Sequence, residues 1–143
     1  MNFPDLKPIS LFRLQQMANN AYYSFERKWD GTAVSVTKTK NEIILTGRGI
    51  LKDGSQSDYT DKFPELVSAI EDSLHPNHPG SFLGEIVVAM DGVSNEVKES
   101  FQSLQSRTTR IEDIEEYARK YPATLLLFDR EGPSNYLIRK NIL

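Results

Sequence analysis

The chain has 143 residues, of which 38% are apolar and 26% are charged, so it is long enough for one compact domain and too short for several of ordinary size. The composition is that of a soluble globular protein and excludes a disordered chain. The net charge of -3, from 17 basic and 20 acidic residues, argues against a protein that coats nucleic acid through bulk charge. The absence of cysteine excludes disulfides, thiolate metal sites and a cysteine nucleophile. Neither a membrane-spanning apolar run nor a secretory signal is found, so we expect a cytoplasmic protein, or a nucleoid-associated one in a prokaryote.

The first elements predicted are a helix and two strands. Apolar residues at helical spacing follow Ser10, which predicts a helix that is capped by Ser10 and ends near Asn19. From Tyr22 to Arg27 the side chains alternate with the period of a strand, and the β-branched run Thr32–Thr37 predicts a second strand. The two strands flank Asp30-Gly31, a dipeptide typical of tight turns.

The middle of the chain is predicted to contain a hairpin, a loop and a helix. Glu42–Thr46 is expected to fold back as an antiparallel strand on the one before it, with Gly47-Arg48-Gly49 as its end. The polar stretch Lys52–Asp61 predicts a loop. Pro64 is tolerated in a first helical turn, and the apolar stripe after it predicts a helix to about Leu74.

The last part of the chain is predicted to add two strands and a helix. Phe82–Val88 is a strongly β-prone run, and Thr109 with Glu112 has the pattern of a capping box for the helix that follows. The nearly all-apolar run Ala123–Asp129 suits a central strand that is buried on both faces. With no internal repeat or linker, these elements predict one α+β domain over residues 1–143, built on a mainly antiparallel sheet with flanking helices.

A lysine stands at the end of a predicted strand in the tetrapeptide Lys28-Trp29-Asp30-Gly31. A strand end fixes the direction of a side chain, and glycine lets a ligand approach the backbone closely. Alone, such a tetrapeptide is more often a surface lysine beside an ordinary turn. The functional interpretation depends on the segments that follow it in order: Thr46-Gly47-Arg48-Gly49, Tyr59-Thr60-Asp61-Lys62-Phe63-Pro64-Glu65-Leu66, Phe82–Val88, Phe101-Gln102-Ser103-Leu104-Gln105-Ser106-Arg107 and Leu127-Phe128-Asp129.

Together these segments resemble, from about Tyr23 to Asp129, the adenylation (nucleotidyltransferase) domain of ATP-dependent DNA ligases. The tetrapeptide is similar to the family's Lys-x-Asp-Gly motif, and Phe82–Val88 is similar to its Gly-Glu-aliphatic-aliphatic strand. The resemblance implies the first part of the ATP-grasp-like fold of DNA ligases and mRNA-capping enzymes. It also implies a reaction that uses ATP and Mg²⁺, in which a lysine amine attacks the α-phosphate and AMP then passes to the 5′-phosphate of nicked DNA. Lys28 is the matching nucleophile.

The resemblance implies further roles around the nucleotide. Glu26 would accept a hydrogen bond from adenine, Phe128 would stack on the base, and Arg48 would reach the ribose, the phosphates or the nick. Glu85 would bond a ribose hydroxyl or help to place the metal. A carboxylate within a β-prone run is costly without a partner, which disfavours an ordinary exposed strand carboxylate at this position. By the chain's own pattern, Phe128 also suits core packing.

Other residues are assigned to the turn and to nucleic acid. Asp30 is expected to shape the turn rather than to react, and Gly31 to admit the nucleotide to the backbone. Four basic residues are candidate contacts to the DNA backbone, although solvated surface is the commoner place for such residues: Arg107, Arg110, Lys38 and Lys40.

The chain departs from the family's pattern in two places. The motif usually continues Lys-x-Asp-Gly-x-Arg, but Ala33 stands at the arginine position, so that contact is absent or supplied elsewhere. After Asp129 neither the late Glu-Gly strand nor the closing Lys-x-Lys pair is found, nor is there room for an oligonucleotide-binding domain. We therefore expect a partial adenylation domain, with weak or undetectable self-adenylation and no sealing by itself. A missing C-terminal ligase segment, or a second copy on an exposed apolar sheet face or edge, is the expected partner.

Three interpretations follow, and whether this chain alone is an enzyme stays open among them. The first is a DNA ligase adenylation segment, which the Phe-Pro-Glu-Leu and Phe-Gln-x-Leu-Gln segments favour. The second is a segment of an RNA ligase or another polynucleotide adenylyltransferase, which Ala33 alone favours. The third is a non-catalytic remnant that keeps a nucleotide pocket.

Overall fold

The computed structural model describes residues 8–18, 29, 31–73, 79–88, 108–109 and 113–132. The described elements follow one another in the order α1 (Leu11–Ala18), β1 (Thr32–Lys38), β2 (Ile43–Ile50), β3 (Gln56–Asp58), η1, a 3-10 turn (Thr60–Lys62), α2 (Pro64–Ser73), β4 (Gly80–Val88), α4 (Ile114–Lys120) and β5 (Ala123–Arg130).

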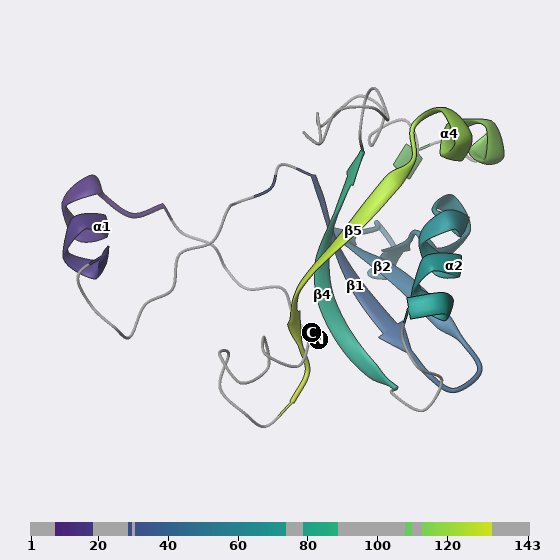
Figure 1. The fold of residues 1–143 in the computed structure, drawn as a ribbon, viewed down its shortest axis with the longest axis horizontal. Helices are drawn as coiled ribbons and strands as arrows, with labels where there is room; N and C mark the ends of the chain where they lie inside the picture. The colour runs from purple at the N-terminus through teal and green to yellow at the C-terminus, as the bar shows by residue number, and fades with distance from the viewer. Residues whose placement is uncertain are drawn as a thin grey trace.

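The strands form one sheet in the order β3-β2-β1-β4-β5, and every neighbouring pair is antiparallel. Figure 1 shows α2 and α4 on the same side of this sheet. The predicted α+β class with an antiparallel sheet and flanking helices is therefore confirmed. The hairpin of β1 and β2 is also confirmed, with Val36 opposite Leu45 and a turn in which the Thr39 amide donates to the Glu42 carbonyl at 2.8 Å.

The main core lies between the sheet and α2. Strand side chains alternate between the two faces of a sheet, and the residues that meet α2 are spaced two apart along each strand. We call this side the helix-side face and define it by its fully or largely buried strand residues: Val34, Val36, Leu45, Phe82, Ile86 and Val88. Phe63, Leu66 and Ile70 cover that face from the α2 side, and Phe63 is fully buried. The helical spacing after Pro64 thus produces the apolar stripe that the sequence predicts.

The other side of the sheet carries the intervening strand residues. We call it the opposite face and define it by Ala33, Ser35, Leu83, Glu85 and Val87, which alternate with the helix-side residues. Leu83 and Val87 are buried here as well, whereas Glu85 is half-buried. The opposite face therefore combines apolar positions with a carboxylate in the middle of the sheet.

Two predicted boundaries around β2 are wrong. Strand β2 continues through Gly47-Arg48-Gly49 to Ile50, and the predicted loop Lys52–Asp61 contains β3 and most of η1. The reason is non-local, because β3 pairs with the second half of β2, with Ile50 opposite Gln56. Gly47 does not end the strand: the Tyr59 ring lies where a side chain at Gly47 would stand, since an added Cβ would come within 2.5 Å of the ring.

Two predictions in the last part of the chain are also wrong. Helix α4 begins at Ile114, after Asp113 in the left-handed region, and so Thr109 is not its cap. Strand β5 is not central, because within the described residues it pairs only with β4 and lies at the edge of the sheet. Its residues are half-buried or exposed. The apolar composition of Ala123–Asp129 reflects contact with the core on one side rather than burial on both.

Helix α1 is confirmed as predicted. The Ser10 hydroxyl accepts from the Arg13 amide at 3.3 Å, and the Ser10 carbonyl accepts from Leu14 at 2.9 Å. In Figure 1 this helix stands apart from the sheet. Its apolar residues Leu11 and Phe12 are both 70% exposed, so the exposed apolar surface among the described residues lies here and near Ile50. Self-association through an exposed apolar sheet face or edge stays a prediction.

The predicted strand Tyr22–Arg27 lies outside the described residues. In the part of the chain that the structure describes, no helix is long and apolar enough to cross a membrane.

Candidate active site

Gly31 and Glu85 meet on the opposite face of the sheet. The Gly31 amide donates to Oε1 of Glu85 at 2.9 Å, which ties the turn before β1 to the middle of β4. The backbone lies very close to β4 here, because a Cβ added to Gly31 would stand 2.2 Å from the Ile86 carbonyl oxygen and 2.9 Å from Cγ1 of Val87. Only glycine fits at this position without movement of β4. A partly buried carboxylate in a β-prone run thus has a partner after all.

The sheet register shows which residues lie beside Glu85 on the neighbouring strands. Ala33 lies directly opposite Glu85, and Glu85 lies opposite Leu126 on its other side. Arg48 follows Gly47, the partner of Val34, and lies in the stretch of β2 between Thr46 and Ile50 where the pairing with β3 is irregular. Arg48 is exposed, and its strand lies two strands from that of Glu85, which is roughly 10 Å.

Phe128 occupies an irregularity of β5. Leu83 pairs with Asp129 whereas Gly84 pairs with Leu127, so Phe128 is the extra residue of a β-bulge. The bulge interrupts the alternation of the two faces, and Phe128 is not among the partly buried residues that pack against the helix-side core, as Leu127 does. It is half-buried. The predicted stacking role stays a prediction.

The two lysines of the β1 hairpin lie away from this group. Lys38 is at the far end of β1 from Gly31, roughly 23 Å along the strand, and is only 7% exposed. Lys40 follows it in the turn and is exposed. The structure does not bring either to the Gly31–Glu85 site, and the burial of Lys38 disfavours a role on the DNA-binding surface.

The remaining candidate residues lie outside the described residues: Lys28, Glu26, Asp30, Arg107 and Arg110. Trp29 is described and is half-buried. The sequence did not reveal the Gly31–Glu85 contact, because it joins residues 54 positions apart and depends on the register of β1 on β4.

The Phe63-Pro64-Glu65-Leu66 segment supports the fold rather than the chemistry. Pro64 opens α2, and Phe63 and Leu66 are buried in the core. Glu65 reaches the next layer, where its Oε1 accepts from the Ala123 amide at 3.3 Å, at the start of β5. Lys62 beside it donates to the Thr108 carbonyl and lies 5.7 Å from the centroid of the Tyr59 ring.

With this geometry in view, the relatives of the chain identify its family. Residues 10–130 match the family described as the ATP dependent DNA ligase domain. The chain belongs to this family.

The curated relatives of this ligase segment include DNA ligases. It is 33% identical over 104 residues to a DNA ligase of Methanothermobacter thermautotrophicus, a match that covers 73% of the chain and 17% of that enzyme. It is 31% identical over 106 residues to a DNA ligase of Thermococcus fumicolans, again over 17% of that enzyme. The chain therefore spans about a sixth of the length of these relatives.

Solved ligase structures share the fold of this ligase segment. The ligase domain of LigD from M. tuberculosis superposes with a TM-score of 0.55 at 22% identity, over 82% of the chain and 34% of that domain's chain. A mycobacterial DNA ligase D complexed with ATP and MES gives the same values. The recognition made from the motifs, and the nucleotidyltransferase fold it implied, are confirmed.

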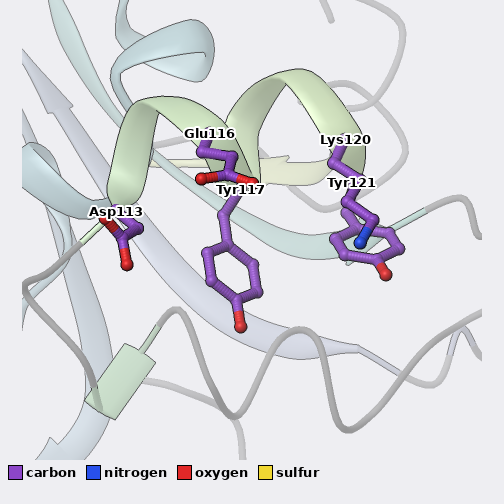
Figure 2. A pocket seen from close by; sticks show the side chains of 5 residues that line it. All are labelled: Asp113, Glu116, Tyr117, Lys120 and Tyr121. Carbon is purple, nitrogen blue, oxygen red and sulfur yellow. The ribbon is translucent and has the colours of Figure 1, made fainter.

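A hollow of about 240 Å³ lies elsewhere on the ligase segment, beside α4. Figure 2 shows its lining side chains, which are Asp113, Glu116, Tyr117, Lys120 and Tyr121. The Tyr117 and Tyr121 ring centroids are 6.0 Å apart, and Nζ of Lys120 is 5.2 Å from the Tyr121 ring centroid. None of the predicted site residues that the structure describes lines it, and neither Gly31 nor Glu85 is among its lining residues.

Proposed function

We propose that this chain binds ATP on the opposite face of the sheet and forms the covalent lysyl-AMP intermediate of a DNA ligase on Lys28. The observation that carries the proposal is the Gly31–Glu85 hydrogen bond, since it joins the Lys28-Trp29-Asp30-Gly31 motif to the Gly-Glu strand. Membership of the ATP-dependent family supports ATP as the nucleotide.

In the proposed step the neutral Lys28 amine attacks the α-phosphorus of ATP. A bond forms between Nζ and the α-phosphorus, the bond to the bridging oxygen breaks, and pyrophosphate leaves with that electron pair. The amine gives up a proton to solvent or to a nearby base. Such a transfer depends mainly on positioning and on stabilising the phosphate charge, and the amine reacts only when it is unprotonated.

The other residues are proposed to bind and orient the nucleotide. Phe128 is suited to stack on adenine, because its ring is half-buried and stands at a bulge, where a side chain is re-aimed. Glu26 is proposed to accept from the adenine amino group. Arg48 is exposed, and its guanidinium is proposed to contact phosphate or ribose oxygens, in place of the arginine absent at position 33.

Mg²⁺ is proposed to be held chiefly by ATP. Among the described residues no group of three or more His, Asp or Glu could hold a metal ion. One or two carboxylates are enough for Mg²⁺, which keeps several of its waters and also binds the substrate phosphates. Glu85 has one oxygen not used by Gly31 and would supply such a carboxylate. The ion, when bound, would neutralise charge that develops on the phosphates.

Nick sealing is proposed to need the rest of a ligase. The chain spans about a sixth of the two curated relatives, which carry the name DNA ligase. We infer that AMP transfer to the 5′-phosphate of nicked DNA requires the segments outside this span, with self-adenylation weak in their absence. The names of these relatives favour DNA over RNA as the nicked strand.

Intact-mass measurement after incubation with ATP and Mg²⁺ tests the proposal. We expect a small fraction of the chain to gain one adenylyl group, no gain in Lys28→Ala or Lys28→Arg, and an unchanged gain in Lys40→Ala, an exposed lysine outside the site. An ATP-dependent rise in melting temperature without an adduct would indicate a nucleotide-binding remnant. If ATP produces no adduct and no rise in melting temperature, the proposal is contradicted. Robust nick sealing by the chain alone would contradict the proposed need for further ligase segments.

A further inference from the structure

We propose that the turn joining β2 to β3 is a contact surface for duplex DNA beside a nick. We call residues 50–55 the hairpin tip, in which the exposed Ile50 and Leu51 meet the minor groove and the exposed Lys52 binds a backbone phosphate. The inference rests on the proposed function for the place of the nick. It concerns described residues for which the sequence predicts no ligand.

The hairpin tip lies at the end of the sheet that carries Gly31. Gly47 is opposite Val34 on an antiparallel strand, so Ile50, three residues further on, is at about the level of Gly31. The pairing of β2 with β1 ends at Gly47, whereas β1 stays paired with β4 beyond this point. There β2 pairs only with β3 among the described strands. The hairpin tip therefore projects from the sheet at the same end as the proposed site of adenylation.

Two adjacent aliphatic side chains are exposed at the hairpin tip. Ile50 is 75% exposed and Leu51 is 50% exposed, and every residue from Arg48 to Gln56 is exposed. Single exposed apolar residues are common on protein surfaces. An adjacent pair on a hairpin that includes the edge strand β3 is different, because such an edge favours aggregation when nothing covers it. The apolar pair therefore indicates a surface that binds something.

The turn that presents this pair is held by hydrogen bonds within the hairpin tip itself. The Leu51 amide donates to the Ser55 carbonyl at 2.7 Å, and the Gly54 amide donates to the Leu51 carbonyl at 2.9 Å. Gly54 has a φ of 84°, in the left-handed region that glycine adopts without strain. Because the turn already has a defined shape, little conformational entropy is lost when it binds.

The charges of the hairpin suit a polyanion. Among the described residues, the side chains of Arg48 and Lys52 make no hydrogen bond or ion pair. The acidic residues of the hairpin are engaged by the fold. Oδ1 of Asp53 accepts from the Ser55 amide at 2.9 Å and from its hydroxyl at 2.6 Å, and Oδ1 of Asp58 accepts from a backbone amide of η1 at 2.8 Å. The cations are thus available to phosphates, while the carboxylates serve the turn and η1.

This combination favours DNA over a protein partner. Protein interfaces are rich in aromatic residues and poor in lysine, aspartate and serine, whereas the hairpin tip has no aromatic residue and contains Lys52, Asp53 and Ser55. Proteins that bind the minor groove insert Leu or Ile side chains at base steps and hold the neighbouring phosphates with basic residues. A nick interrupts one backbone, so the bases beside it part more easily than those of an intact duplex. The apolar pair therefore suits the nick itself, and Lys52 suits a phosphate next to it.

Anisotropy of a fluorescent nicked duplex, measured without ATP or Mg²⁺, separates the two kinds of contact. Ile50→Ser combined with Leu51→Ser removes the apolar pair, and Lys52→Ala removes the charge. The matched controls are Leu11→Ser, at a leucine of α1 that is 70% exposed, and Lys40→Ala, at an exposed lysine in the turn after β1. All these side chains are exposed, so every variant should keep the melting temperature of the wild type.

We expect the wild type to bind the nicked duplex roughly 3- to 10-fold more tightly than the same duplex after sealing. The combined serine variant should lose this preference and keep the salt dependence of binding. Lys52→Ala should weaken binding to both duplexes alike and reduce the slope of log K against log salt by about one, as loss of one phosphate contact does. The controls should leave the preference and the slope unchanged.

A crosslink tests where the hairpin tip lies on the duplex. Because the chain has no cysteine, Leu51→Cys supplies a single thiol for a benzophenone label. We expect irradiation to crosslink this label to the nicked duplex within half a helical turn of the nick, about five base pairs. The same label on Leu11→Cys should give no crosslinks that cluster at the nick.

The outcomes decide between DNA and the alternatives. Wild-type affinity in the combined serine variant and in Lys52→Ala would overturn the inference and leave the apolar pair to a protein partner, such as the ligase segments outside this chain. Equal shifts in Lys40→Ala, crosslinks that do not cluster at the nick, or no binding of the nicked duplex by the wild type at low salt would overturn it as well. If the chain forms no adduct with ATP while DNA binding depends on the hairpin tip as expected, the proposed function fails and the contact surface stands.

Discussion

The residues on the two faces of the sheet have different roles. On the helix-side face, Val34, Val36 and Ile86 are fully buried against α2 and contribute through packing. On the opposite face, the half-buried carboxylate of Glu85 accepts a hydrogen bond from the Gly31 amide. One face therefore serves packing, and the other is the one that we propose binds the nucleotide, so substitutions on the two should affect stability and ATP binding separately.

The largest expected effect comes from the helix-side face. Phe63→Ala removes a fully buried aromatic ring beside the sheet and should lower the free energy of unfolding by about 3–5 kcal/mol. Urea denaturation measures this loss. Ile50→Ala, at a position that is 75% exposed, should change stability by less than about 0.5 kcal/mol. Similar losses in the two variants would show that Phe63 is not part of the main core.

Gly31→Ala tests whether the close approach of the turn to β4 affects both stability and ATP binding. Its Cβ would overlap the Ile86 carbonyl oxygen, so we expect a loss of about 1–3 kcal/mol from overpacking, together with loss of the ATP response. Gly49→Ala is the matched control, because its Cβ would lie 3.4 Å from Oγ of Ser57. Melting curves with and without ATP give both quantities. A Gly31→Ala protein with wild-type stability and ATP response would mean that the turn does not need its close approach to β4.

The two faces were also unequally predictable from the sequence. The core followed from local spacing, as in the β-branched alternation around Val34 and the helical stripe after Pro64. Strand β3 was missed because Gln56–Asp58 is polar and forms a strand only through pairing with β2. The Gly31–Glu85 contact was missed for a similar reason, since it exists only once β1 and β4 are in register. Both features that the sequence did not predict depend on pairing between strands that are distant in the chain.

A smaller effect on stability is expected at Arg48. The side chain is exposed, so Arg48→Ala should change the free energy of unfolding by less than about 0.5 kcal/mol. If Arg48 contacts the nucleotide, loss of a hydrogen bond to a charged group, worth about 1.5 kcal/mol, should raise the half-saturating ATP concentration by about tenfold. Titration with ATP measures this. The matched control is Arg119→Ala, which removes an exposed arginine of α4, and an equal shift there would exclude a specific role for Arg48.

The smallest expected effect is a pH dependence of the free energy of unfolding, which comes from Tyr59 in the core. Burial raises the pKa of the Tyr59 phenol, although a hydrogen bond with Ser57 partly opposes the rise. The folded-state pKa lies above the unfolded value of about 10, so the neutral Tyr59 phenol contributes fully to the stability of the fold below about pH 10. This contribution is lost as the pH rises through the folded-state pKa. Tyr59→Phe removes this loss, so the free energy of unfolding should fall less in Tyr59→Phe than in wild type between about pH 9 and pH 11. Urea denaturation at the two pH values measures the difference, and parallel declines would show that the Tyr59 hydroxyl titrates as it does in the unfolded chain.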